Sequence, residues 1–321
     1  MEKKKVILDV DTGTDDAIAI MTAVMSENLE ILGVCAVNGN RGIDFTTENT
    51  LRVIEYLGKD IPVFRGCSLP MVVSLTEGRR EDIPYKGPKD PQDNVHGDYI
   101  DLPPATIQEQ PVSAVRWLVD TLMASEGDIT LIPVGPLTNI AMALRIEPRI
   151  AQKIKRIVIM GGGCREVNIT PTAEFNFWID PEAAKIVFDC GCDILVVPLD
   201  ATHAAAVSIR TAEALERKGT RPATLTARII RQRQNAYKHW QPMADIDSVP
   251  VHDALAVCAV LDESVLGPVV ETYADVDIGK GAADGMSIFD LDNRYKDRKK
   301  NVKVALGADP EHFADMLLNI L

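Results

Sequence analysis

Short apolar runs alternate with longer amphipathic segments along most of the chain. Polar or glycine-rich turns bound these runs, as is typical of buried strands. The runs predict β-strands at residues 6–9, 29–37, 129–134, 154–160 and 194–199, with further strands around 62–64, 269–276, 286–290 and 302–304. Helical periodicity predicts helices at residues 44–58, 112–125, 211–218, 222–240, 254–261 and 309–321, with others after Asp16, after the turn 135–139 and from Pro181.

The alternation of strands and helices predicts the fold class. Strands separated by helices pair in parallel, because the helix returns the chain to the same edge of the sheet. No linker or internal repeat divides the 321 residues. We therefore predict an α/β fold, with a single domain over residues 1–321 and a mainly parallel, Rossmann-like central sheet flanked by helices.

Four aspartates crowd the junction of the first strand and the first helix. Asp9 and Asp11 end the strand, Gly13 lies in the turn, and Asp15 and Asp16 open the helix. One carboxylate suffices to cap a helix, whereas four carboxylates this close repel one another unless a cation or hydrogen-bond donors hold them. Hard cations such as calcium and magnesium bind oxygen ligands of this kind. The pattern favours a metal or polyol site over a merely well-capped helix.

Three known motifs fit this segment less well. An EF-hand loop requires an acid at its fifth position, where counting from Asp9 gives Gly13. A phosphate-binding loop requires a lysine that this segment lacks. An aspartyl phosphatase of the haloacid dehalogenase type also begins with Asp-x-Asp after its first strand, but Thr12 separates Asp11 from the glycine here and the later aspartate pair stays unexplained.

Polar or glycine residues also follow other predicted strands, namely Asn40, Gly135, the glycines at 161–163, and Asp200. Ligands of open α/β sheets bind outside the carboxyl ends of the strands. These residues and the aspartates therefore predict one site built from many loops. The three glycines indicate a tight turn or a close approach of backbone to a ligand. They fail as a dinucleotide fingerprint, because Glu166 occupies the third glycine position.

Two segments are harder to interpret. Residues 66–105 are rich in glycine, proline and charge, and a long irregular segment inside a compact domain is usually functional or mobile. This segment contains His96, which alone is weak support for a site. The helix predicted at 222–240 ends in aromatic residues, among them Tyr237 and Trp240. That end suits a packing surface and the wall of a base pocket equally well.

Composition and charge narrow the choice of partners and compartment. Hydrophobic residues make up 46% and charged residues 25% of the chain, an ordinary globular balance. The net charge of −13 argues against nucleic acid or an anionic membrane as the main partner. We find no signal-peptide core after the basic N-terminus and no apolar run near the roughly 18 residues of a membrane span. Six scattered cysteines without a Cys-x-x-Cys pair predict reduced thiols in a cytoplasmic protein.

The aspartate segment resembles the N-terminal signature of the nucleoside hydrolase family, Asp-x-Asp-x-Gly-x-Asp-Asp. The family usually has a proline before the glycine, and this chain has Thr12 there. Other segments are similar to the family in the same order: Gly-Pro-Leu-Thr-Asn at 135–139, Met160 with three glycines, Asn168, Glu-Phe-Asn at 174–176, and His252 with Asp253. The resemblance covers nearly the whole chain, and ordered matches are far more specific than any single one. It implies the family's α/β fold in a homodimer or homotetramer.

The resemblance also implies a set of site residues. Calcium would be held by Asp11, Asp16, Asp253 and the backbone carbonyl of Val134, with a water and two ribose hydroxyls completing its shell. A second set of polar side chains would hold the ribose: Asp15, Asn40, Asn168, Glu174 and Asn176. Residues expected on the nucleobase side are His96, His252 and, from the aromatic helix end, Trp240.

The implied reaction is calcium-dependent hydrolysis of the N-glycosidic bond of ribonucleosides, giving free base and ribose. Anionic oxygens would stabilise the oxocarbenium-like ribose, and Asp11 would act as general base on a water that the metal positions. His252 is the candidate acid for the leaving base, because imidazole titrates near neutrality. A structural role for His252 in supporting Asp253 is the alternative. The sequence does not identify the preferred nucleobase.

Two other functions stay open. A metal-dependent phosphohydrolase would phosphorylate Asp9 or Asp11, and parallel assays with nucleosides and phosphomonoesters separate it from a nucleoside hydrolase. A non-catalytic ribose- or nucleoside-binding protein on the same fold would bind nucleosides without turnover.

Overall fold

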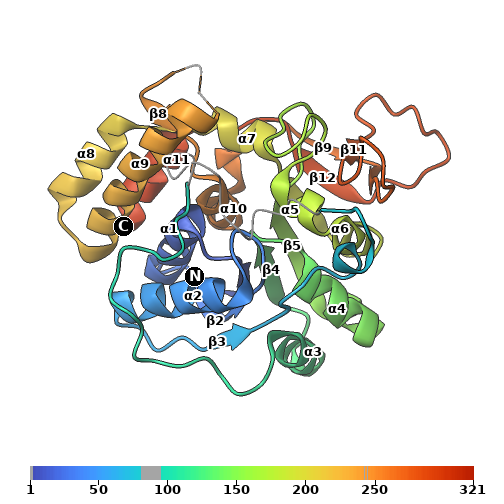
Figure 1. Ribbon diagram of the computed structural model, residues 1–321, viewed down its shortest axis with the longest axis horizontal. Helices are drawn as coiled ribbons and strands as arrows, with labels where there is room; N and C mark the ends of the chain where they lie inside the picture. Colours follow the sequence, from blue (N-terminus) through green and yellow to red (C-terminus); the bar gives the residue numbers. More distant parts are fainter. Residues whose placement is uncertain (1–2, 81–94, 242, 244) are drawn as a thin grey trace.

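An eight-stranded sheet runs through the centre of the computed structural model, which describes residues 3–80, 95–241, 243 and 245–321 without the side chains of residues 239 and 240. Figure 1 shows the sheet between layers of helices. The strand order is β3-β2-β1-β4-β5-β6-β12-β9. These strands are β1 (Lys4–Val10), β2 (Leu29–Ala36), β3 (Val63–Arg65), β4 (Ile129–Pro133), β5 (Ile154–Met160), β6 (Ile194–Val197), β9 (Val269–Thr272) and β12 (Val302–Ala305).

Neighbouring strands of this sheet are parallel except for β12 and β9, which are antiparallel at one edge. The predicted fold class, a single α/β domain with a mainly parallel sheet, is therefore confirmed. Two small antiparallel pairs lie outside the sheet: β7 (Val207–Ser208) with β8 (Ser248–Val249), and β10 (Ala274–Val276) with β11 (Ser287–Phe289).

Helices pack against both faces of the sheet in two hydrophobic clusters. One cluster includes α1 (Thr14–Met25), α2 (Ile43–Leu57), α8 (Ile209–Lys218), α9 (Arg221–Trp240), α10 (His252–Leu261) and α11 (Pro310–Ile320). The other includes α3 (Ala114–Ala124), α4 (Thr138–Ile146) and α6 (Pro181–Phe188). The short helical elements are α5 (Phe175–Ile179), α7 (Leu199–Ala204), η1 (Val73–Leu75), η4 (Pro148–Lys153) and η5 (Glu263–Val265).

Strand β1 shows why short apolar runs predicted the sheet. Val6, Leu8 and Val10 belong to one hydrophobic cluster, whereas Ile7 belongs to the other. Successive side chains of a strand point to opposite faces, and both faces of this sheet are covered by helices. A strand in such a position therefore reads as a continuous apolar run rather than as an alternating one.

The sequence-based element boundaries were wrong in two places. The run 194–199 ends as a strand at Val197, since Pro198 offers no backbone N–H for a sheet, and helix α7 follows it. Asp200 consequently lies in the first turn of α7, where it accepts hydrogen bonds from the backbone of Cys164 and Arg165. The run 269–276 is divided at Tyr273 between β9 and β10, which belong to different sheets.

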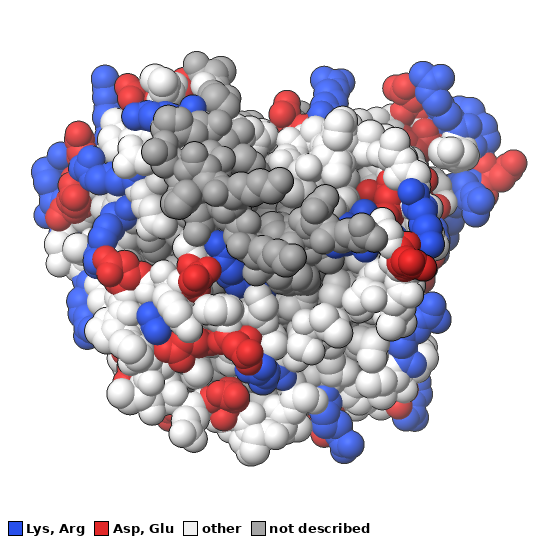
Figure 2. Space-filling view, viewed as in Figure 1, with Lys and Arg blue, Asp and Glu red and all other residues white. Residues whose placement is uncertain are grey.

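The surface charge and the lengths of the helices bear on which partners the protein can bind. In Figure 2, acidic and basic side chains are interspersed over the visible face, and no continuous basic surface appears there. None of the helices in the described part of the chain is long and apolar enough to cross a membrane.

Candidate active site

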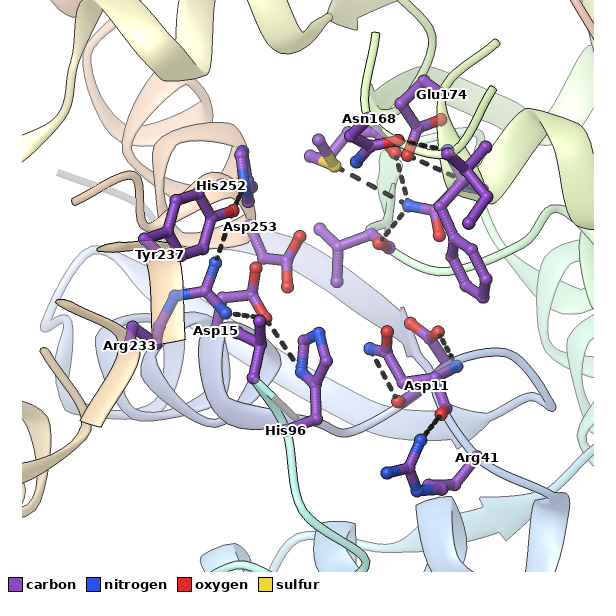
Figure 3. A pocket seen from close by; sticks show the side chains of 17 residues that line it. Asp11, Asp15, Arg41, His96, Asn168, Glu174, Arg233, Tyr237, His252 and Asp253 are labelled. Carbon is purple, nitrogen blue, oxygen red and sulfur yellow. Dashed lines mark hydrogen bonds and ion pairs between the residues drawn. The ribbon is translucent and has the colours of Figure 1, made fainter. Parts of the chain in front are cut away.

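A pocket opens at the carboxyl ends of the central strands, as the sequence predicted (Figure 3). Its walls come from the loops after β1, β2, β4 and β5, from α9 and from the start of α10. The lining residues are Asp11, Asp15, Asn40, Arg41, Val95, His96, Val134, Met160, Asn168, Ile169, Glu174, Phe175, Asn176, Arg233, Tyr237, His252 and Asp253. Of the predicted site residues, Asp16 is buried behind this lining, and the side chain of Trp240 lies outside the described residues.

Three buried carboxylates meet at one side of the pocket. Asp15, Asp16 and Asp253 each place an oxygen within 4.8 Å of the others. The backbone at the start of α1 orients Asp16, which accepts hydrogen bonds from the amides of Gly13 (2.9 Å) and Asp11 (3.1 Å). Burial and mutual repulsion raise the pKa of Asp11 and of Asp253 well above the usual range and that of Asp16 to about 7.

This donor set fits a hard divalent cation. It consists of buried anionic oxygens, the ligand type that such cations prefer. The side chain of Arg233 forms an ion pair with Asp15 (3.0 Å), yet the pKa of Asp253 still rises in its presence. The protein therefore compensates the gathered negative charge only in part, and a bound cation would complete that compensation.

Asp11 lies beside the three carboxylates, clamped between two loops. Its Oδ2 accepts a hydrogen bond from the backbone amide of Asn40 (2.6 Å). A Cβ atom on Gly39 would lie 2.1 Å from Oδ2, and one on Gly135 would lie 2.6 Å from Oδ1. Glycine is therefore required on both sides of this carboxylate. The side chain of Asn40 also reaches Asp16, donating to its Oδ2 (3.2 Å).

The opposite wall of the pocket carries Asn168, Glu174 and Asn176. Glu174 caps α5 and accepts hydrogen bonds from the amides of Gly162 (2.8 Å) and Asn176 (2.8 Å). Burial nevertheless raises the pKa of Glu174 to about 7. The side-chain amide of Asn176 donates to the carbonyl of Val134 (2.8 Å), and the side-chain oxygen of Asn168 accepts from the backbone of α5. These bonds fix the polar groups that face the pocket.

His252 lies at the base of a buried hydrogen-bond chain. Its Nδ1 lies 2.7 Å from the hydroxyl of Thr202, and its Nε2 lies 2.7 Å from the hydroxyl of Tyr237. Thr202 donates its own proton to the carbonyl of Leu199 (3.3 Å), so Nδ1–H of His252 donates to Thr202 and Nε2 accepts from Tyr237. Burial, with the charge of Arg233, lowers the pKa of His252 well below 6.5. This direction differs from the near-neutral titration on which the acid role of His252 was predicted.

Arg233 is a site residue that the sequence interpretation missed. Its side chain is only 1% exposed, and it donates to the hydroxyl of Thr14 (2.9 Å), the carbonyl of Pro250 (3.1 Å) and the hydroxyl of Tyr237 (3.4 Å). The available signal was spacing, because Arg233 lies one helical turn before Tyr237 and one turn after Ile230 on the buried stripe of α9. An arginine on an apolar stripe indicates a buried partner.

His96, which the family resemblance placed on the nucleobase side, lines the pocket beside Asp15. Its Nδ1 accepts a hydrogen bond from the backbone amide of Thr14 (3.2 Å) and lies 3.6 Å from Asp15 Oδ1. Burial lowers the pKa of His96 to about 4, so the ring is neutral at pH 7. A Cβ atom on Gly13 would lie 2.1 Å from His96 Nδ1, which explains the glycine at this turn.

Comparison with known proteins defines the class of enzyme. The family model described as "Inosine-uridine preferring nucleoside hydrolase" matches residues 6–315, and the chain belongs to this family. The protein is a ribonucleoside hydrolase. The family is metal-dependent, and the buried aspartates supply a candidate metal site.

Individual relatives agree with this assignment. The chain is 36% identical over 318 residues to the "Pyrimidine-specific ribonucleoside hydrolase RihB" of Escherichia coli O157:H7, covering 98% of this chain and 95% of the relative. A plant nucleoside hydrolase, PpNRh1, superposes with a TM-score of 0.86 at 29% identity, covering 98% of both chains. A purine-preferring ribonucleoside hydrolase from Gardnerella vaginalis superposes with a TM-score of 0.85 at 27% identity, covering 98% of this chain and 97% of that one.

These findings bear on the two alternative functions. Asp9, one candidate for phosphorylation, is buried, receives a hydrogen bond from Asn139 (2.9 Å) and does not line the pocket. The matched family consists of hydrolases of nucleosides, so the phosphohydrolase and the non-catalytic binding protein both lose their support.

Proposed function

We propose that this protein is a calcium-dependent hydrolase of pyrimidine ribonucleosides, with Asp11 as the general base. The observation that carries the proposal is the group of buried carboxylates, Asp15, Asp16 and Asp253, in a pocket that polar side chains face from the other wall. The likeness to a relative described as pyrimidine-specific supports the choice of base. By analogy with the family, the enzyme works as a homodimer or homotetramer in the cytoplasm.

The calcium ligands in this proposal are Asp11, Asp16, Asp253 and the carbonyl oxygen of Val134. When bound, the ion orients the ribose hydroxyls and lowers the pKa of water. The carbonyl of Val134 accepts one hydrogen bond, from Asn176, and a carbonyl oxygen has a second lone pair for a cation. Calcium accommodates this mixture of carboxylate and carbonyl oxygens better than softer metals do.

Asp11 accepts the proton of the attacking water. Its Oδ2 accepts a hydrogen bond from the amide of Asn40, which fixes the orientation of the carboxylate in the pocket. Burial beside Asp16 raises the proton affinity of the Asp11 carboxylate, as a general base requires. General base catalysis of this kind contributes a factor of about 10²–10⁴ in rate.

The ribose is held by Asp15, Asn40, Asn168, Glu174 and Asn176. Glu174 is held in place by backbone amides, so its carboxyl oxygens are preorganised in the pocket, where we place the sugar. Fixed anionic oxygens stabilise the positive charge that develops on the ribose ring as the glycosidic bond breaks.

The leaving base is activated by Arg233, with Tyr237 and His252 holding it in position. A guanidinium has five N–H donors. Four of the five N–H groups of Arg233 have acceptors among the described residues. Nε–H donates to the carbonyl of Pro250, Nη1 donates to Thr14 and pairs with Asp15, and one Nη2–H donates to Tyr237. The remaining Nη2–H is available to a carbonyl oxygen of the base, where a permanent cation withdraws electron density without transferring a proton.

His252 is then a positioning residue rather than the acid. Its Nε2 fixes the hydroxyl of Tyr237, which in turn holds Arg233 (Figure 3). The depressed pKa of His252 keeps the ring neutral, so its Nε2, which accepts from Tyr237, carries no proton for the leaving base.

The test is the release of ribose from a panel of uridine, cytidine, inosine, guanosine and adenosine, with calcium present. We expect uridine and cytidine to be hydrolysed fastest, and the Asp11→Asn variant to serve as the inactive control. Equal or faster hydrolysis of the purine nucleosides would overturn the pyrimidine assignment. Absence of ribose from all five would overturn the proposed reaction.

A further inference from the structure

A Cys-Gly-Cys sequence lies at the edge of the molecule that is opposite the pocket. Cys190, Gly191 and Cys192 form the turn between α6 and β6, at the amino end of that strand. The active site lies at the carboxyl ends of the strands. The hydrolase reaction therefore makes no use of these two thiols.

The two thiols lie on one turn, and that turn is open. The thiol of Cys192 donates a hydrogen bond to the carbonyl oxygen of Ala151 (3.3 Å). Gly191 has a φ of 81°, and a Cβ atom placed on it would meet nothing within 4 Å. Both cysteines are partly exposed, so a small molecule in solution can reach the turn.

The spacing of the two residues permits a disulfide. Cα atoms two residues apart are separated by at most about 7 Å, and disulfides span about 4.4–6.8 Å between Cα atoms. A glycine with positive φ between them gives the backbone the freedom to adjust.

Cys190 differs from the other cysteines in its acidity. The hydrogen bond from Cys192 lowers the pKa of the Cys190 thiol below its usual range. Burial raises the pKa of Cys67 and of Cys164 to about 12, although both are also partly exposed. Thiolate is the nucleophilic form of cysteine. Partial exposure therefore does not by itself make a cysteine of this protein more acidic. The neighbouring Cys192 distinguishes Cys190 from the others.

A metal site is the competing use of paired thiols. Structural zinc sites take four ligands from cysteine and histidine. Among the described residues, only the aspartates in the pocket form a group of three or more His, Cys, Asp or Glu side chains close enough to hold an ion. No third ligand from the described residues therefore joins Cys190 and Cys192, which favours a disulfide over a metal site.

We propose that Cys190 and Cys192 form a reversible dithiol–disulfide site that reacts with small-molecule disulfides such as oxidised glutathione. The Cys190 thiolate attacks one sulfur of the small disulfide, and one thiolate of that molecule leaves. Cys192 then gives its proton to solvent and attacks the Cys190 sulfur, and the second thiolate leaves. Two protein thiols and one small disulfide thus give one protein disulfide and two small thiols.

The experiment is a peptide map of the reduced full-length protein after incubation with oxidised glutathione and acid quenching. Trypsin cleaves after Lys185 and Arg210, so Cys190 and Cys192 fall in one peptide without any other cysteine. Cleavage after Arg156 and Arg165 isolates Cys164 as an internal control. We expect the 186–210 peptide to become lighter by two hydrogens, while the Cys164 peptide stays unmodified.

Two variants assign the roles of the thiols. Cys192→Ser removes the second thiol, so Cys190 should retain one glutathione as a mixed disulfide. Cys190→Ser removes the attacking thiol, and its peptide should remain unmodified. The proposal is overturned if the wild-type peptide stays reduced or carries glutathione without closing to a disulfide. It is also overturned if Cys164 reacts as readily as the pair.

Discussion

Replacing Arg233 by methionine tests both the buried ion pair and the activation of the leaving base. Arg233 is 1% exposed and lies 3.0 Å from Asp15, itself buried. Removing the cation leaves the Asp15 carboxylate buried without its partner, which costs about 3–5 kcal/mol of unfolding free energy. The matched control is Arg228→Met on the same helix, where the side chains of Arg228 and Asp101 are 50% and 82% exposed. Loss of such a surface pair costs about 0–1 kcal/mol.

The effect on catalysis follows from the remaining Nη2–H donor. A hydrogen bond from a charged group is worth about 1.5–3 kcal/mol, so its loss should lower kcat/KM for uridine by about 10–100-fold. A riboside with a nitrophenol leaving group needs no such withdrawal and should lose much less. Arg233→Lys retains charge but not the planar fork, so it should keep more stability than Arg233→Met while still losing activity on uridine.

Denaturant unfolding without substrate and kinetics on the two substrates provide the measurements. An Arg233→Met variant no less stable than Arg228→Met would contradict a stabilising buried ion pair. Equal loss of activity on uridine and on the nitrophenyl riboside in the folded Arg233→Lys variant would contradict activation of the leaving base by Arg233.

Three further changes test the other roles. Asp11→Asn should lower kcat by about 10²–10⁴-fold while nucleoside binding, measured by calorimetry, persists; an unchanged kcat would remove Asp11 as the base. His252→Ala should impair hydrolysis of uridine more than that of the nitrophenyl riboside without loss of calcium; equal impairment together with loss of calcium would indicate a metal-supporting role. His96 has a folded pKa of about 4, below its value of 6.5 in the unfolded chain, so its neutral form stabilises the fold above pH 6.5 and this stability is lost as the pH falls toward 4. Between pH 7 and pH 4, the unfolding free energy of His96→Asn should therefore fall less than that of the wild type, by at most about 3 kcal/mol. Denaturation curves of both proteins at the two pH values measure this, and an equal fall in both would contradict it.

The strands and the clustering of aspartates at the first strand–helix junction could be predicted because their signals are local. Val6 to Leu8 predict a buried strand from three consecutive residues, and the aspartates from Asp9 to Asp16 follow within one turn. The strand break at Tyr273 was missed because no glycine or proline interrupts residues 269–276, and only tertiary pairing assigns β9 and β10 to different sheets.

The side of the pocket formed by α9 and α10, which we propose faces the nucleobase, could not be predicted in the same way. Arg233 and Tyr237 meet Asp15 and His252 only after α9 and α10 pack beside α1. Before folding, His252 shows only an ordinary imidazole, and its depressed pKa arises from burial and from the charge of Arg233. Such properties depend on contacts between distant segments rather than on the residue itself.

The most direct test of the central claim is the activity of the enzyme on uridine before and after removal of its metal, with metal content measured on the same samples. We expect about one calcium per chain as purified, loss of ribose release after chelation, and recovery when calcium is added back. Full ribose release by protein that contains no divalent metal would contradict the assignment of the buried aspartates to a catalytic calcium site.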